Sequence, residues 1–91
     1  MTTERLIELY EIVLDQIKKD VPYGICGVIR CLSRGREITL DEIEFLLWHF
    51  DKKCSNRFTS LYDWGYYFPR GEVEPRIKLI QELIEDLKND L

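Results

Sequence analysis

The fold is decided by residues 39–53, TLDEIEFLLWHFDKK, which carry both the start signal and the apolar stripe of a helix. Thr39 and Glu42 have the spacing of a capping box, in which each side chain accepts a hydrogen bond from the other residue's backbone N–H. Apolar residues then recur every three or four positions, which is typical of a helix that buries one face. These residues are Ile43, Leu46, Leu47 and Phe50. The pattern predicts a helix that ends near Lys52 and Lys53, whose positive charges suit a helix C-terminus.

Two further helices are predicted on the N-terminal side of this segment. The first covers residues 4–19, with Thr2 or Thr3 as its N-cap. Its inward-facing residues are expected to be Leu6, Leu9, Tyr10, Val13, Leu14 and Ile17. The second follows Pro22 and ends at Gly35, because glycine readily adopts the left-handed conformation that closes a helix. Its buried residues are expected to be Ile25, Val28, Ile29 and Leu32.

The chain after the central segment divides into a long irregular stretch and a final helix. Residues 54–72 lack helical periodicity, and a stretch of that length in a small domain is usually functional or partly structured. The final helix is expected to open at Pro75, a favourable first-turn residue, and to run to the C-terminus. Its apolar stripe is Ile77, Ile80, Ile84, Leu87 and Leu91, broadened by Leu79 and Leu83. The sequence thus predicts a mainly α fold, a small four-helix single domain over residues 1–91 with a long aromatic loop, in which residues 58–68 could instead form a short hairpin.

Composition and charge restrict the class of partner. The chain has 91 residues, with 13 Lys and Arg against 17 Asp and Glu, for a net charge of −4. That balance argues against binding duplex nucleic acid, which needs a broad basic surface. Residues 21–36 and 52–71 are nevertheless each basic, so a small anionic ligand or a local acidic patch fits better. No apolar run is long enough to cross a membrane, and the three cysteines are an odd number, so we expect no membrane association and a reducing, cytoplasmic location.

The most unusual segment is residues 58–71, FTSLYDWGYYFPRG, which holds six of the eleven aromatic residues. Aromatic faces stack on nucleobases, and forked guanidinium groups hold phosphates. The candidate ligand-binding residues are Trp64, Tyr66, Tyr67, Phe68, Arg70, Arg76, Arg30 and Arg34. Two of these arginines flank the start of the final helix, which favours anions, and two share one face of the second helix. A lid over the core also explains at least half of these aromatic residues, and Trp, Tyr and Arg together are typical of protein interfaces as well.

The sequence predicts neither catalysis nor a metal site. His49 is the only histidine and is interpreted as a structural residue of its helix. Cys26, Cys31, His49 and Cys54 make a Cys3His set by count, but the first two lie about 140° apart around a helix and cannot converge on one ion. Neither a Gly-rich phosphate loop nor a nucleophile motif occurs. We therefore expect a protein that is not an enzyme and that carries no metal or cofactor.

Two segments resemble those of small phage-encoded accessory proteins. They are Gly24-Ile25-Cys26 at the start of a short helix and Tyr67-Phe68-Pro69-x-Gly71-x-x-x-Pro75-Arg76-Ile77 before the closing helix. The resemblance covers these motifs and the order of the elements, but not the first helix. It implies interference with a host process, since some such proteins sequester nucleotide immune signals and others block a host protein. The positions carried over are Gly24, Cys26, Tyr67, Phe68, Pro69, Gly71 and Arg76, and position 67 is Tyr where Trp is common in the family.

The function expected from these observations is sequestration of a small phosphate-containing nucleotide signal of host immunity, in the host cytosol. An aromatic residue would stack on the base, while Arg70 and Arg76 would hold the phosphates. Such contacts total about 4–9 kcal/mol before the cost of immobilisation. Tight capture therefore favours a homo-oligomer, in which Arg30 and Arg34 complete the site from the same or a second subunit. The alternative is a protein-binding inhibitor of a host defence factor that acts through the aromatic–Arg loop.

Overall fold

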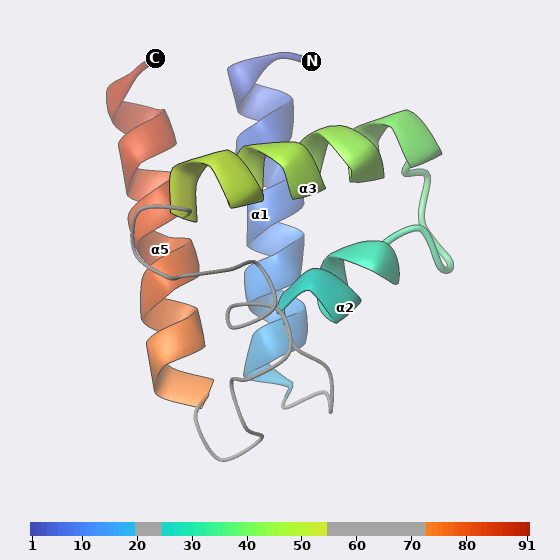
Figure 1. Ribbon diagram of the computed structural model, residues 1–91, viewed down its shortest axis with the longest axis horizontal. Helices are drawn as coiled ribbons and strands as arrows, with labels where there is room; N and C mark the ends of the chain where they lie inside the picture. Colours follow the sequence, from blue (N-terminus) through green and yellow to red (C-terminus); the bar gives the residue numbers. More distant parts are fainter. Residues whose placement is uncertain (20–24, 55–72) are drawn as a thin grey trace.

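Four helices form the part of the chain that the computed structural model describes, which is residues 1–19, 25–54 and 73–91 (Figure 1). They are α1 (Thr3–Lys18), α2 (Ile25–Arg30), α3 (Leu40–Cys54) and α5 (Val73–Asn89). No strand occurs in these three stretches, so the mainly α four-helix fold is confirmed. The hairpin considered within residues 58–68 lies outside the described residues.

Two long helices, α1 and α5, lie side by side and antiparallel, which brings the two ends of the chain to the same end of the molecule (Figure 1). Helix α2 packs against both α1 and α3. Helix α3 crosses the α1–α5 pair (Figure 1). None of the described helices has the length and apolar character needed to span a membrane.

The helix ends follow the local signals in the sequence. Thr2 is the N-cap of α1, and its hydroxyl oxygen accepts a hydrogen bond of 3.1 Å from the backbone N–H of Arg5. The capping box of α3 is confirmed, because the Thr39 N–H donates to Glu42 Oε1 at 3.0 Å and the Glu42 N–H donates to Thr39 Oγ1 at 3.2 Å. Gly35 has a φ of +70°, the left-handed conformation expected of it. Local sequence thus defines the starts of α1 and α3, whereas Gly35 closes the turns that follow α2 and not the helix itself.

Two helices differ in extent from the prediction. Helix α2 ends at Arg30, and the chain continues to Gly35 as tight turns, in which the N–H groups of Leu32 and Arg34 donate to the carbonyls three residues earlier, at 3.1 and 3.2 Å. Helix α5 begins two residues before Pro75 and ends at Asn89. Leu91 therefore lies beyond the helix and is 67% exposed, so the prediction that it faces inward is wrong.

Within the described residues, the core consists of the inward faces of α1, α2, α3 and α5. Most of the residues predicted to face inward are buried, and Ile7 and Ile38 join them. The partly buried exceptions are Leu14, Leu47 and Ile77. The face of α3 that points away from this core is left for contact with solvent or a partner.

Candidate functional site

The predicted ligand-binding residues divide into two groups. Five lie outside the described residues, namely Trp64, Tyr66, Tyr67, Phe68 and Arg70. The structure describes the remaining three, which are Arg30, Arg34 and Arg76.

Arg76 is the fourth residue of α5 and is the largest fully buried side chain among those described, at 1% exposed. Its guanidinium therefore lies inside the protein, not on an open surface, and it takes part in an interaction there. Burial fixes a long side chain in one position, as a preformed site requires, but it also suits a structural role. Contact between Arg76 and a phosphate stays a prediction.

Arg30 and Arg34 are both exposed, at the C-terminal end of α2 and in the turn after it. The nearby Arg36 guanidinium donates to the carbonyl oxygens of Leu32, at 3.3 Å, and Arg34, at 3.4 Å, and so helps to close these turns. Figure 1 shows the C-terminal end of α2 pointing away from the start of α5. The C-terminal end of α2, where Arg30 lies, is therefore separated from the start of α5, where Arg76 lies.

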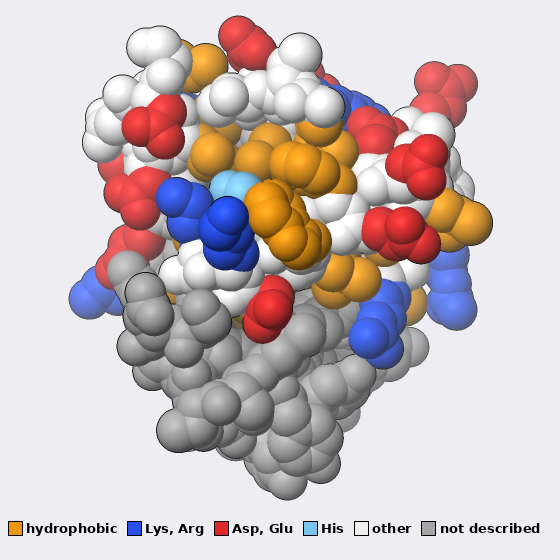
Figure 2. All heavy atoms as spheres, turned by 45° about the horizontal axis from the view of Figure 1, so that its top comes forward, with side chains coloured by type: hydrophobic (Ala, Val, Ile, Leu, Met, Phe, Trp, Pro, Cys, Tyr) orange, Lys and Arg blue, Asp and Glu red, His pale blue; other side chains and the backbone are white. Residues whose placement is uncertain are grey.

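A second candidate surface lies on the outward side of α3, where hydrophobic side chains gather next to basic ones (Figure 2). Trp48 is 53% exposed, and its ring lies 5.5 Å from the ring of the half-buried Phe45. The ammonium group of Lys52 lies 4.9 Å from the centre of the Trp48 ring, within cation–π range. Exposed Trp beside a second aromatic ring is typical of a binding surface.

This aromatic pair rests on a buried polar contact. The Phe45 ring stacks on His49, with 6.5 Å between ring centres, and His49 Nδ1 lies 2.8 Å from the hydroxyl of Tyr10. His49 is 9% exposed, and its pKa is lowered by burial and by the positive charges of Lys53 and Lys52. His49 thus lies largely buried between α3 and α1, which fits a structural role, and that role stays a prediction.

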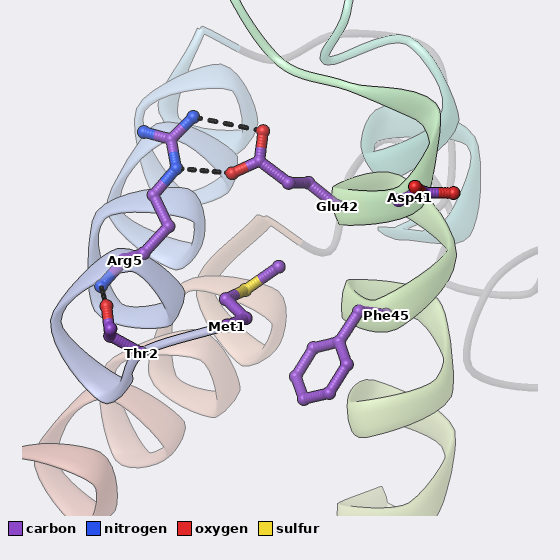
Figure 3. Close-up of a pocket in the computed structure, with 6 residues that line it drawn as sticks. All are labelled: Met1, Thr2, Arg5, Asp41, Glu42 and Phe45. Carbon is purple, nitrogen blue, oxygen red and sulfur yellow. Dashed lines mark hydrogen bonds and ion pairs between the residues drawn. The ribbon is translucent and has the colours of Figure 1, made fainter.

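An open pocket of about 460 Å³ lies between the N-terminal ends of α1 and α3 (Figure 3). It is lined by Met1, Thr2, Arg5, Asp41, Glu42 and Phe45. The guanidinium of Arg5 forks onto the Glu42 carboxylate, with Nε 2.6 Å from Oε2 and Nη2 3.3 Å from Oε1. These hydrogen bonds, with a backbone hydrogen bond from Thr39, lower the pKa of Glu42 to about 2.

Neither this pocket nor a second of about 430 Å³ suits a phosphate. In the first, the Arg5 fork is already occupied by Glu42, and Asp41 adds a negative charge. The second is lined by three carboxylates together with Ile12 and Arg36, and the carboxylates would repel an anion. They belong to Glu8, Glu11 and Asp15. Within residues 1–19, 25–54 and 73–91, no group of three His, Cys, Asp or Glu side chains could hold a metal ion.

Sequence reasoning missed Arg5 and the exposure of Trp48. Arg5 gives no local signal, because Glu42 lies 37 positions away. The exposure of Trp48 does have a local signal, since Trp48 falls opposite the apolar stripe of α3 on a helical projection. Comparison of the chain with protein-family models, with curated proteins and with solved structures gave no match.

Proposed function

We propose that this protein binds a small phosphate-bearing nucleotide at the beginning of α5 and acts by sequestering it. The observation that supports the proposal best is the burial of Arg76 in the first turns of that helix. A buried arginine is held rigidly, so its guanidinium would lose little further freedom if a phosphate shared the interaction that it already makes. The positive end of the helix dipole also favours an anion there.

The residues before the helix supply the remainder of the proposed site. Arg70 precedes Arg76 by only six positions, so the chain keeps the two within about 20 Å of each other. The aromatic residues from Trp64 to Phe68 would stack on the base. Arg30 and Arg34 would contribute from a second subunit, because the C-terminal end of α2 points away from the start of α5. By the resemblance to phage accessory proteins, the ligand would be a nucleotide signal of host immunity.

The proposal is tested by incubating the purified protein with cyclic and linear nucleotides and measuring its melting temperature. A ligand that binds only the folded state raises the melting temperature, and it can be recovered from the protein after heat denaturation. We expect at least one nucleotide to do both. No shift and no recovered nucleotide across the panel would refute sequestration, and capture of one stoichiometric protein from host lysate would then favour the protein-binding alternative.

Three variants locate the site. Arg70→Gln and Arg76→Lys are each expected to weaken nucleotide binding by about 10- to 100-fold, since each loses a charge-assisted or forked contact. Lys78→Gln is the matched control, because Lys78 is an exposed basic residue of the same helix. Circular dichroism establishes whether each variant folds. If folded Arg76→Lys binds as tightly as the unaltered protein, Arg76 is a structural residue and the site is misplaced.

A further inference from the structure

The outward side of α3 carries a narrow stripe of four residues that the proposed function does not use. Asp41, Phe45, Trp48 and Lys52 are spaced by four, three and four positions, so they share one face of the helix. The opposite face carries Ile43, Leu46 and Phe50, which are buried in the core. The stripe therefore lies on the outward side of α3, and at its N-terminal half Asp41 and Phe45 also line the pocket toward α1.

The centre of this stripe is an apolar surface whose side chains are fixed by packing. Trp48 is half exposed and its ring packs at 5.5 Å on Phe45, which in turn stacks on the buried His49. His49 is anchored to α1 by its contact with the Tyr10 hydroxyl. The rings of Phe45 and Trp48 are thus supported by contacts with the protein interior. A partner would meet a surface that is already ordered, which lowers the entropy cost of binding.

The two ends of the stripe carry opposite charges. Asp41 is exposed at the N-terminal end of α3, and among the described residues its carboxylate has no ion-pair partner. Lys52 is exposed at the C-terminal end, with its ammonium group over the Trp48 ring. The two charges are eleven positions apart, which corresponds to about 16 Å along a helix. Along three turns of α3, an acidic side chain, two aromatic side chains and a basic side chain therefore follow one another.

This arrangement is complementary to itself. Asp41 and Lys52 are equally distant from the midpoint between Leu46 and Leu47, and so are Phe45 and Trp48. A two-fold axis through that midpoint would place a second α3 antiparallel to the first. Each Asp41 would then face Lys52 of the second copy, and each Phe45 would face Trp48 of the second copy. A parallel arrangement would instead bring like charges together.

We propose that this α3 stripe is a self-association surface, through which two copies of the chain pack antiparallel and cover each other's Trp48. The proposal does not depend on nucleotide binding. Exposed acidic residues, Glu44 and Asp51, flank the stripe on one side, and their mutual repulsion at the solvated rim weakens the dimer without opposing its orientation. The self-association is thus expected to be reversible and to depend on protein concentration.

The test is sedimentation equilibrium of the full chain from low micromolar to near-millimolar concentration. The average mass is expected to rise from that of one copy toward that of two. Trp48→Ala should weaken the dimer by at least about tenfold, because a central aromatic residue is lost from each copy. A mass that stays at one copy over the whole range would overturn the proposal, whether or not another protein binds to the stripe.

Charge reversal tests the antiparallel arrangement itself. Asp41→Lys and Lys52→Asp should each weaken the dimer by about tenfold, because each puts like charges opposite one another in both symmetry-related contacts. The double variant should recover most of this loss. Glu85→Lys and Lys78→Asp are matched reversals at exposed positions of α5 and should change nothing. If the folded double variant is as weak as the single ones, the antiparallel pairing is wrong, and circular dichroism identifies the folded variants.

Discussion

The contact between Tyr10 and His49 joins α1 to α3 across 39 positions of sequence. Tyr10 is fully buried and His49 nearly so, and each satisfies the other's polar group at 2.8 Å. Burial and the nearby lysines lower the pKa of His49 below 6.5. The imidazole is therefore neutral at pH 7, with Nδ1 as acceptor or donor according to its tautomer. This neutrality makes His49 sensitive to acid.

Acid should weaken the fold through His49. Well above pH 6.5 the histidine is neutral in both the folded and the unfolded chain, whereas around and below that pH the unfolded chain takes up a proton more readily. The free energy of unfolding should therefore fall as the pH drops from about 7.5 to about 5.5, as measured by urea denaturation. His49→Gln should remove most of this dependence, since the chain has no other histidine. An unchanged slope in this variant would assign the pH dependence to another group.

Glu42 should respond to pH in a lower range. Its pKa in the folded protein is about 2, chiefly because Arg5 donates to its carboxylate, whereas the ordinary value is 4.5. Its contribution to stability is therefore complete above pH 4.5 and is lost as the pH falls toward 2. Carbon-detected NMR titration should show Arg5→Gln raising the Glu42 pKa. The exposed Glu44, two positions along the same helix, is the control, and an equal shift there would contradict a specific pairing.

At the scale of the helix, sequence is informative where the signal is local. The Thr39–Glu42 capping box and the Gly35 turn were predictable because their partners lie within a few residues. Helix faces were predictable for the same reason, since spacing alone determines which residues share a face. What spacing does not reveal is the residue that meets that face. For this reason Arg5 with Glu42, and Tyr10 with His49, could not be paired in advance.

The turn after α2 offers a direct test of its glycine. Gly35 has a φ of +70°, and a β-carbon built there would meet no heavy atom within 4 Å. A larger residue at this position would therefore lose stability because of its backbone conformation, and not because its side chain collides with neighbouring atoms. Gly35→Ala should lower the free energy of unfolding by about 1 kcal/mol, and Gly35→Asn by less, because asparagine tolerates this conformation better. Urea denaturation measures both, and an alanine variant as stable as the unaltered chain would contradict this reasoning.

At the scale of the whole molecule, charge is distributed by element and not uniformly. The two described pockets carry acidic groups, and the exposed arginines among the described residues lie at the C-terminal end of α2 and in the turns that follow it. The net charge of −4 therefore describes no single surface of the protein. The same holds for the candidate site, since the sequence predicts that Arg30 and Arg76 belong to one site, whereas the C-terminal end of α2 points away from the start of α5. Only tertiary packing decides which charges become neighbours.

The prediction of one domain can be tested through the packing of α1 against α5. Leu9 of α1 is completely buried, and the two helices lie at opposite ends of the sequence. Leu9→Ala should lower the free energy of unfolding by about 2–5 kcal/mol through loss of burial and creation of a cavity. In a domain of this size, a loss of about 2–5 kcal/mol is a large part of the total stability. If the domain unfolds as one cooperative unit, every helix must be destabilised by the same amount.

Hydrogen exchange of the Leu9→Ala variant measures this transmission. The amides of α3 and α5 should lose as much protection as those of α1, because a two-state domain opens as one unit. Leu40→Ala is the control, since Leu40 is 73% exposed and its truncation should change stability by less than about 0.5 kcal/mol. Protection that falls in α1 but persists in α5 would mean that the two helices unfold separately. Helix α5 would then keep its structure, and Arg76 its position, without the support of α1.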